Sequence, residues 1–314
     1  MHPLPDSISL HIGAHKTASS HLQNLLYKNR GLLAEANIRV YGPRYLRMQG
    51  RNLAAMFGTS WSESPTPRRK PQRQLKFLAK GRSHMVLSEE NLVGNLADQK
   101  GRTVMPLYPA AQDRVQELVS KWAPVPTELF LAVRDPTSFL ASAYSQAMFG
   151  GIHIRPRQFR LKNDWREVDW AEYVDRLRAV TGLSNIYVWR QEDYNQSQRL
   201  IMAKLLRWDH ADDLKIIDKR VHQGLSVSAV QHTLEAASEG QTGTLARDAR
   251  RAFPVGDAHK LFDLYSESAK RKSREAYAEQ MARIEGMDGV TVLRPTPDAS
   301  PHVSPPREDA AQKG

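Results

Sequence analysis

Short apolar segments alternate with longer amphipathic segments over most of the chain. Residues 7–12, 85–87, 129–133 and 186–189 are rich in side chains that favour β-strands, and residues 290–293 add a fifth candidate strand. The segment 129–133 (Leu-Phe-Leu-Ala-Val) is a continuous apolar run. Runs of this kind are typical of strands that are buried on both faces in the middle of a parallel sheet.

Helical patterns follow these candidate strands. After the first strand, leucines recur at helical spacing from Leu22 to Leu33, and Ser19 or Ser20 is placed to cap this helix. Strands that alternate with helices predict right-handed crossovers, and therefore an α/β fold with a central parallel sheet flanked by helices. Past Leu225 the pattern is mostly helical and charged, which predicts a helical C-terminal part.

Proline and charge mark the expected limits of the domain. Residues 65–73 contain four basic residues and three prolines, so we expect a basic, proline-rich loop over residues 59–74. Prolines among polar residues predict a disordered tail over residues 295–314. We expect the remainder, residues 1–294, to form a single domain, and no internal repeat of solenoid length interrupts it.

Composition adds several exclusions and one positive indication. The 314 residues are 40% hydrophobic and 25% charged, as in ordinary globular proteins, and the absence of cysteine excludes thiol catalysis and cysteine-bound metals. No apolar run approaches the roughly 20 residues that cross a bilayer, and the first residues lack a signal-peptide pattern, so we expect a cytoplasmic protein. The net charge of +11 suits a polyanion: nucleic acid, a phosphorylated cofactor, an acidic glycan or a membrane surface.

The loop between the first strand and the first helix, residues 13–20, has the character of a phosphate site. Amide groups converge there at a helix N-terminus, the helix dipole adds partial positive charge, and Lys16 adds a full one. The spacing is not that of a Walker A loop, which needs glycines six and one residues before the lysine, where this chain has Leu10 and His15. Ordinary nucleoside triphosphatase or kinase chemistry is therefore disfavoured.

A second candidate anion site follows the apolar strand 129–133. Arg134 ends this strand, and Ser142 lies about two turns into the next helix. The planar guanidinium of arginine matches the geometry of a phosphate, so Arg134 and Ser142 could bind one. The alternative is a purely structural role, in which Asp135 caps the helix and Arg134 forms a surface ion pair. Proteins with a parallel α/β sheet bind their ligands at the carboxyl ends of the strands. The residues expected together at this edge are Lys16, Thr17, Ser19, Ser20, Glu89, Glu90, Arg134 and Ser142.

Several motifs together resemble bacterial sulfotransferases that use 3′-phosphoadenosine 5′-phosphosulfate (PAPS). Residues 11–23 (His-Ile-Gly-Ala-His-Lys-Thr-Ala-Ser-Ser-His-Leu-Gln) are similar to the family's phosphosulfate loop, usually close to His-Ile-Gly-x-His-Lys-Thr-Gly-Thr-Thr-x-Leu-Gln. Residues 36–43 resemble the segment after the family's first helix, and residues 134–144 resemble its 3′-phosphate site. Residues 191–193 (Gln-Glu-Asp) resemble its Tyr-Glu-Asp-Leu segment, with glutamine in place of the aromatic residue.

The resemblance implies a P-loop-like sulfotransferase fold and a reaction in which a sulfuryl group passes from PAPS to an acceptor hydroxyl or amine, with no metal. Lys16 would stabilise charge on the bridging oxygen, and Arg134 and Ser142 would hold the 3′-phosphate. Arg220, in the segment 219–226, would close over that phosphate. The residues implied at the 5′-phosphosulfate are Gly13, His15, Lys16, Thr17, Ala18, Ser19 and Ser20.

An acceptor hydroxyl must lose a proton as it reacts, so a base is expected at the mouth of the sheet. Glu89 and Glu90 follow the strand 85–87, and a glutamate at this strand end is the base in several branches of the resembled family. Successive strand residues point to opposite sides, so one of the two faces the donor, and the sequence does not say which. His15 is the next candidate.

Two other function classes stay open at this point. One is a P-loop-like nucleotide kinase, which needs Mg²⁺ and a carboxylate such as Asp135 to hold it. The other is a basic nucleic-acid-binding protein, although no helix-turn-helix, zinc-ligand or ribonucleoprotein motif supports it. With a sulfotransferase, the expected partners are the nucleotide donor and a glycan, lipid or small-metabolite acceptor. Neither nucleic acid nor a membrane span is expected, and peripheral membrane contact stays open.

Overall fold

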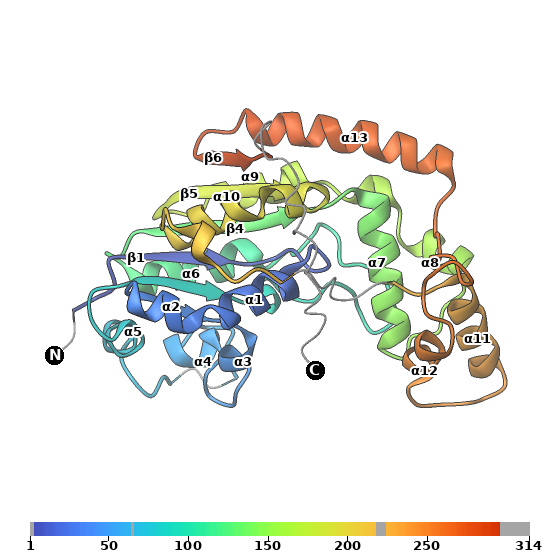
Figure 1. Ribbon diagram of the computed structural model, residues 1–314, viewed down its shortest axis with the longest axis horizontal. Helices are drawn as coiled ribbons and strands as arrows, with labels where there is room; N and C mark the ends of the chain where they lie inside the picture. Colours follow the sequence, from blue (N-terminus) through green and yellow to red (C-terminus); the bar gives the residue numbers. More distant parts are fainter. Residues whose placement is uncertain (1–2, 64–65, 218–223, 296–314) are drawn as a thin grey trace, which may run out of the picture.

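The computed structural model describes residues 3–63, 66–217 and 224–295. A six-stranded sheet with the order β2-β3-β1-β4-β5-β6 forms its centre, and all neighbouring strands are parallel (Figure 1). The expected α/β fold is therefore confirmed. Arg220 lies outside the described residues, as do residues 296–314 of the expected tail and residues 64 and 65 of the expected loop.

The apolar runs in the sequence predict five of these strands correctly. The strand missed by the sequence pattern is β2, a four-residue edge strand in which the charged Arg39 interrupts the apolar residues. Since a half-buried edge strand needs few apolar side chains, a short segment of this kind gives a weak signal. The strands are β1 (Ser7–His11), β2 (Ile38–Tyr41), β3 (His84–Ser88), β4 (Thr127–Val133), β5 (Leu183–Arg190) and β6 (Val290–Leu293).

Helices cover both faces of the sheet. One apolar cluster joins the sheet to α1, α2 and α10, and a larger one joins its other face to α5, α6, α7, α9 and α13. The helices are α1 (Ser19–Lys28), α2 (Arg30–Glu35), α3 (Pro43–Leu46), α4 (Leu53–Phe57), α5 (Pro71–Ala79), α6 (Ala111–Trp122), α7 (Pro136–Phe149), α8 (Pro156–Lys162), α9 (Trp170–Arg178), α10 (Tyr194–Leu206), α11 (Val227–Ser238), α12 (Leu245–Ala252) and α13 (Glu267–Glu285).

The central strand β4 explains why its sequence is continuously apolar. Leu129, Leu131 and Val133 pack into the larger cluster, whereas Phe130 and Ala132 pack into the cluster under α1. All five side chains are fully buried. Because successive side chains of a strand point to opposite faces, a strand covered by helices on both sides has no solvent-facing position to fill with polar residues.

Two local predictions from the sequence are wrong. Neither Ser19 nor Ser20 caps α1: the cap is Ala18, whose φ of 67° lies in the left-handed region, and Ser19 is the first helical residue. The expected loop 59–74 ends early, because Pro71 begins α5. Proline fits the first helical position, where its missing N–H has no partner to lose.

The C-terminal part is helical, as expected, and part of it lies beyond the carboxyl ends of the strands. Figure 1 shows α8, α11 and α12 gathered around the far end of α7, beyond the carboxyl ends of the strands, while α13 runs back along the sheet to β6. Within the described ranges, no helix combines the length and the apolar character needed to cross a membrane.

A leucine deletion in β4 tests the packing of this core. Leu131→Ala is expected to lower the free energy of unfolding by about 2–5 kcal/mol, because it leaves a cavity at a fully buried position. The matched control is Leu161→Ala at a side chain that is 79% exposed, for which a change within about 0.5 kcal/mol is expected. Urea denaturation measures both, and equal losses in the two variants would contradict the assigned burial.

Candidate functional site

A cleft of about 890 Å³ opens at the carboxyl edge of the sheet. The loops that follow β1, β3, β4 and β5 all contribute to its lining, as expected for a parallel sheet. Of the site residues expected from the sequence, the cleft brings together His15, Lys16, Ala18, Ser19, Ser20, Glu90, Arg134 and Ser142. Gly13, Thr17 and Glu89 do not line it.

The loop after β1 wraps around one carbonyl group. Thr17 Oγ1 and Ser19 Oγ donate hydrogen bonds to the carbonyl oxygen of Ala14, at 2.7 and 3.2 Å. In this arrangement the two hydroxyls hold the loop in shape, and their expected role as phosphate donors stays a prediction. The hydroxyl of Ser20 stays in the cleft lining, and the amides of Ser19 and Ser20 have no acceptor among the described residues. Such free first-turn amides attract an anion.

Two non-glycine residues of this loop have left-handed backbone conformations. The φ angles of Lys16 and Ala18 are 63° and 67°. Each costs on the order of 1 kcal/mol, and backbone strain of this kind concentrates at ligand-binding sites. The strain at Ala18 also gives a physical reason for the glycine usual at this position in the resembled family, since glycine adopts positive φ without cost.

Gly13 lies behind the cleft and permits a close approach to Glu90. Its φ is +99°, and a Cβ atom built on it would stand 3.0 Å from the Cβ of Glu90 and 3.2 Å from the amide nitrogen of His15. The role of Gly13 is therefore steric: it lets the loop after β1 pass directly against the loop after β3.

Lys16 points into the cleft without an acidic partner. Its ammonium group donates a hydrogen bond to Oε1 of Gln146 on α7, at 2.9 Å, and no carboxylate of the described residues pairs with it. Burial lowers the pKa of Lys16, and the nearby positive charges of Arg134 and Arg250 lower it further. A cation that is both partly buried and surrounded by like charge favours the binding of an anion beside it.

Arg134 is placed against the same loop. Its Nη1 donates to the carbonyl oxygen of Lys16 at 2.8 Å, and its own carbonyl accepts a hydrogen bond from Trp170 Nε1 at 2.6 Å. Its Nε is buried without a hydrogen-bond partner, and burial lowers the pKa of the guanidinium. The sequence alternative of a surface ion pair for Arg134 is not found among the described residues.

The start of α7 is fixed from behind by two acidic side chains. Asp135 caps the helix by accepting from the amide of Ser138 at 2.9 Å, as the structural alternative expected, and it also accepts from Ser273 Oγ of α13 at 2.8 Å. Glu192 accepts from the amide of Asp135 at 2.9 Å and from the hydroxyl of Tyr277 at 3.3 Å. The segment 191–193 therefore supports the turn that carries Arg134, and Gln191 itself lines the cleft.

The two glutamates after β3 share one arginine but have different surroundings. Glu89 receives three hydrogen bonds from Arg47 and accepts from the amide of Asn91, so it organises the loop. Glu90 lines the cleft and accepts from Gln23 at 2.7 Å and from Arg47 at 2.8 Å. Burial alone would raise the pKa of Glu90, but these hydrogen bonds outweigh it and the pKa is lowered. Of the two, Glu90 is thus the one that faces the cleft.

His15 is held in place by two neighbours. Its Nε2 lies 3.0 Å from Oδ1 of Asn91, and its Nδ1 lies 3.2 Å from the hydroxyl of Tyr108. The acceptor oxygen of Asn91 requires a proton on Nε2, so Nδ1 accepts from Tyr108. Burial is the main cause of the lowered pKa of His15. With both ring nitrogens occupied, His15 is better suited to support the loop than to act as a base.

Several cleft residues were not foreseen from the sequence. They are Arg47 after α3, Gln146 in α7, and Arg247 and Arg250 in α12. None of them directly follows a strand, which is where the sequence pattern predicts the site. The usable signal is the pair Arg247 and Arg250, spaced three residues apart in a short helix, although only the tertiary structure shows that the cleft is beside them.

Comparisons with known proteins give structural neighbours only. No family model and no curated protein matches the chain. A solved sulfotransferase from Alicyclobacillus acidocaldarius is similar over 78% of this chain and 99% of its own, with 15% identity and a TM-score of 0.35. The structure of retinol dehydratase in complex with androsterone and inactive cofactor PAP is similar over 91% of this chain and 83% of its own, with 13% identity and a TM-score of 0.32.

A third neighbour is the PezAT chromosomal toxin–antitoxin system of Streptococcus pneumoniae, with 10% identity, a TM-score of 0.24 and coverage of 90% of this chain and 88% of that one. Because all three TM-scores lie below 0.5, the ligand of this chain has to be inferred from its own cleft.

A pair of substitutions tests the geometry of the loop. Gly13→Ala is expected to destabilise the fold by about 1–3 kcal/mol, because the new methyl group meets Glu90 at a positive φ. Ala18→Gly, the control, is expected to stay within about 1 kcal/mol of the wild type, since it removes strain. Urea denaturation distinguishes the two, and a harmless Gly13→Ala would refute the close approach of the two loops.

The buried His11 makes a pH-dependent contribution to stability. It lies in β1 between Ser88, whose hydroxyl is 2.8 Å from Nδ1, and the stacked ring of Trp189. Burial lowers its pKa from 6.5 to about 4, against the opposing charge of Glu90. Between these values the unfolded chain binds a proton and the folded chain does not. The contribution of His11 to the free energy of unfolding is therefore fully present above pH 6.5, and up to about 3 kcal/mol of it is lost as the pH falls toward 4.

Comparison of the wild type with His11→Gln isolates this contribution. Urea denaturation at several pH values between 7.5 and 4.5 is expected to show a smaller loss of stability in the variant, whatever its absolute stability. Parallel pH profiles for the two proteins would show that His11 titrates normally.

Proposed function

We propose that this protein is a sulfotransferase that uses PAPS as its donor. The observation that carries the proposal is the placement of Lys16 and Arg134, two partly buried cations without acidic partners, in one cleft, joined by the hydrogen bond from Arg134 to the Lys16 carbonyl. A ligand that carries two separate anionic groups satisfies both.

The lining of the cleft suits the two ends of such a donor. Lys16, Ser20 and the free amides at the start of α1 would bind the 5′-phosphosulfate, while Arg134 and Ser142 would bind the 3′-phosphate. A volume of about 890 Å³ falls in the range of clefts that hold a nucleotide-sized molecule. The cations supply the neutralising charge themselves, so binding is expected without a divalent metal.

The reaction exchanges one sulfur–oxygen bond for another. The bond from sulfur to the bridging oxygen of the donor breaks, the acceptor oxygen forms a new bond to sulfur, and adenosine 3′,5′-bisphosphate leaves. Lys16 would donate a hydrogen bond to that bridging oxygen as it becomes negative. The loop amides and Arg134 hold the donor in line, so the enzyme contributes position and charge rather than a covalent intermediate.

Glu90 is the proposed acceptor of the proton. It faces the cleft, and its lowered pKa keeps it ionised at neutral pH, ready to accept a hydrogen bond from an acceptor hydroxyl. A carboxylate of low pKa is a weak base, so orientation of the hydroxyl is the larger part of its role. Glu89 is assigned to the loop instead, because Arg47 and the amide of Asn91 occupy its oxygens.

Calorimetric titration tests the donor. The wild type is expected to bind adenosine 3′,5′-bisphosphate in the presence of EDTA and to prefer it to adenosine 5′-monophosphate. Arg134→Ala is expected to raise the Kd of the bisphosphate about ten- to hundredfold, because charge-assisted hydrogen bonds to the 3′-phosphate are lost, and to raise that of the monophosphate by a smaller factor, because Arg134 also supports the Lys16 loop.

The matched control is Arg178→Ala, which removes one positive charge from the surface of α9, where Arg178 pairs with Asp175. It is expected to leave both affinities unchanged. Failure of the wild type to bind the bisphosphate would overturn the proposal, and stronger binding of ATP with Mg²⁺ would favour the kinase alternative.

A further inference from the structure

Two arginines of the cleft have no role in the proposed binding of the donor. Arg247 and Arg250 of α12 line the same cleft as Lys16, and neither forms an ion pair with any described residue. The neighbouring Arg251 does not line the cleft and pairs with Asp248 at 3.5 Å. The donor's two anionic ends already have ligands on the other wall, so α12 presents positive charge to a further group.

Arg250 is held in position by an aromatic ring. Its guanidinium carbon stands 5.0 Å from the centre of the Phe149 ring, at the end of α7. Stacking of this kind orients a guanidinium while leaving its hydrogen-bond donors free. The charge of Arg250 also reaches Lys16, where it contributes to the lowered pKa. Arg250 therefore faces the end of the cleft where sulfuryl transfer would occur.

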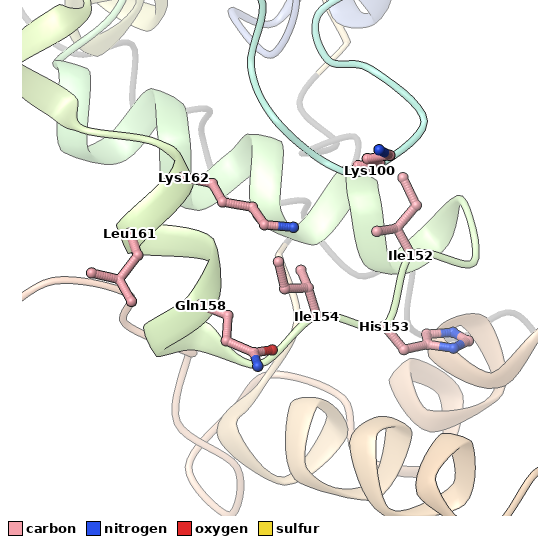
Figure 2. Close-up of a pocket in the computed structure, with 7 residues that line it drawn as sticks. All are labelled: Lys100, Ile152, His153, Ile154, Gln158, Leu161 and Lys162. Carbon is pink, nitrogen blue, oxygen red and sulfur yellow. The ribbon is translucent and has the colours of Figure 1, made fainter.

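A shallow hollow of about 460 Å³ is the neighbour of the cleft. Ile152 lines both spaces, so they lie on either side of this residue. Figure 2 shows Lys162 on one side of the hollow, with Ile154 below the end of its side chain, and Lys100 on the other side, with Ile152 beside it. Neither lysine forms an ion pair with a described residue. The hollow thus combines two unpaired cations with a small apolar floor.

Negative charge along this path is sparse. The acidic residues that line the cleft are Glu90, which is bonded to Arg47, and Asp98, whose carboxylate accepts from the amides of Lys100 and Arg102. No acidic residue of the described ranges lines the hollow. A series of positive side chains therefore lines the two neighbouring spaces, with Lys16 and Arg250 in the cleft and Lys100 and Lys162 in the hollow.

We propose that this series binds the acceptor, and that the acceptor is an acidic glycan chain that carries carboxylates. The inference rests on the proposed function and extends it to the second substrate. A sugar chain supplies the hydroxyl that reacts near Glu90, carboxylates for Arg247, Arg250 and the two lysines, and apolar ring faces for the isoleucines. Positive side chains in two neighbouring spaces, which share Ile152, favour an extended acceptor over a compact metabolite.

The experiment measures glycan binding separately from donor binding. The probe is a hexasaccharide of unsulfated uronic acid and N-acetylhexosamine units, titrated at low salt into protein saturated with adenosine 3′,5′-bisphosphate, and maltohexaose is the neutral control. The wild type is expected to bind the acidic probe and not the neutral one. The double substitution Arg247→Ala and Arg250→Ala is expected to raise the Kd of the acidic probe at least about tenfold.

The controls separate the acceptor site from general charge and from the donor site. Arg251→Ala removes a charge from the same helix and is expected to change the Kd of the probe less than about twofold, since its guanidinium is exposed and paired. The Kd of the bisphosphate is expected to stay within about threefold of the wild-type value in the double variant. Lys162→Ala, in the hollow, is expected to raise the Kd of the hexasaccharide but not the Kd of free glucuronate.

Each contrary outcome has a definite meaning. If the double variant loses as much affinity for the bisphosphate as for the acidic probe, the arginines belong to the donor site and the proposal is overturned. An unchanged affinity of the double variant for the acidic probe also overturns it. Glucuronate binding as tight as the hexasaccharide indicates a small anionic acceptor and refutes the extended one. If the wild type does not bind the bisphosphate, the proposed function fails, and the same titration on the protein alone still tests whether α12 binds an acidic glycan.

Discussion

The hydrogen bond from the guanidinium of Arg134 to the carbonyl of Lys16 is the interaction on which the arrangement of the cleft depends. It joins the ends of two adjacent strands, β1 and β4, and brings together side chains that are 118 residues apart in the chain. Two positive groups repel each other, so their proximity has to be maintained by the rest of the protein. The buried sheet below and the network around Asp135 and Glu192 do this by fixing both backbones.

This arrangement stores an unfavourable charge distribution that a ligand can relieve. Lys16 and Arg134 are partly removed from water without forming an ion pair among the described residues, and burial lowers the pKa of both groups despite the charges of Glu90 near Lys16 and of Glu192 and Asp135 near Arg134. The left-handed conformations of Lys16 and Ala18 add backbone strain in the same loop. Each of these features costs stability, and an anion bound between the cations recovers part of it. Such costs are expected at a binding site and are difficult to explain otherwise.

The sequence predicted the features that depend on local pattern. The strands apart from β2, the parallel sheet and the meeting of Lys16, Glu90, Arg134 and Ser142 at one edge follow from apolar runs and from the geometry of βαβ units. It could not predict that Thr17 and Ser19 would bond to the Ala14 carbonyl, because the loop conformation decides this. The arginines of α12 were missed for another reason: no rule of spacing brings a helix near residue 250 to a loop near residue 16.

The network behind Arg134 gives α13, the last helix of the described residues, an importance beyond packing. Ser273 and Tyr277 of α13 hold Asp135 and Glu192, although neither side chain lines the cleft. During synthesis on the ribosome these residues emerge after every described cleft residue has been made. A nascent chain that contains strands β1 to β5 but not yet α13 therefore lacks part of the support for the Arg134 turn, and the cleft gains that support only when α13 has been made.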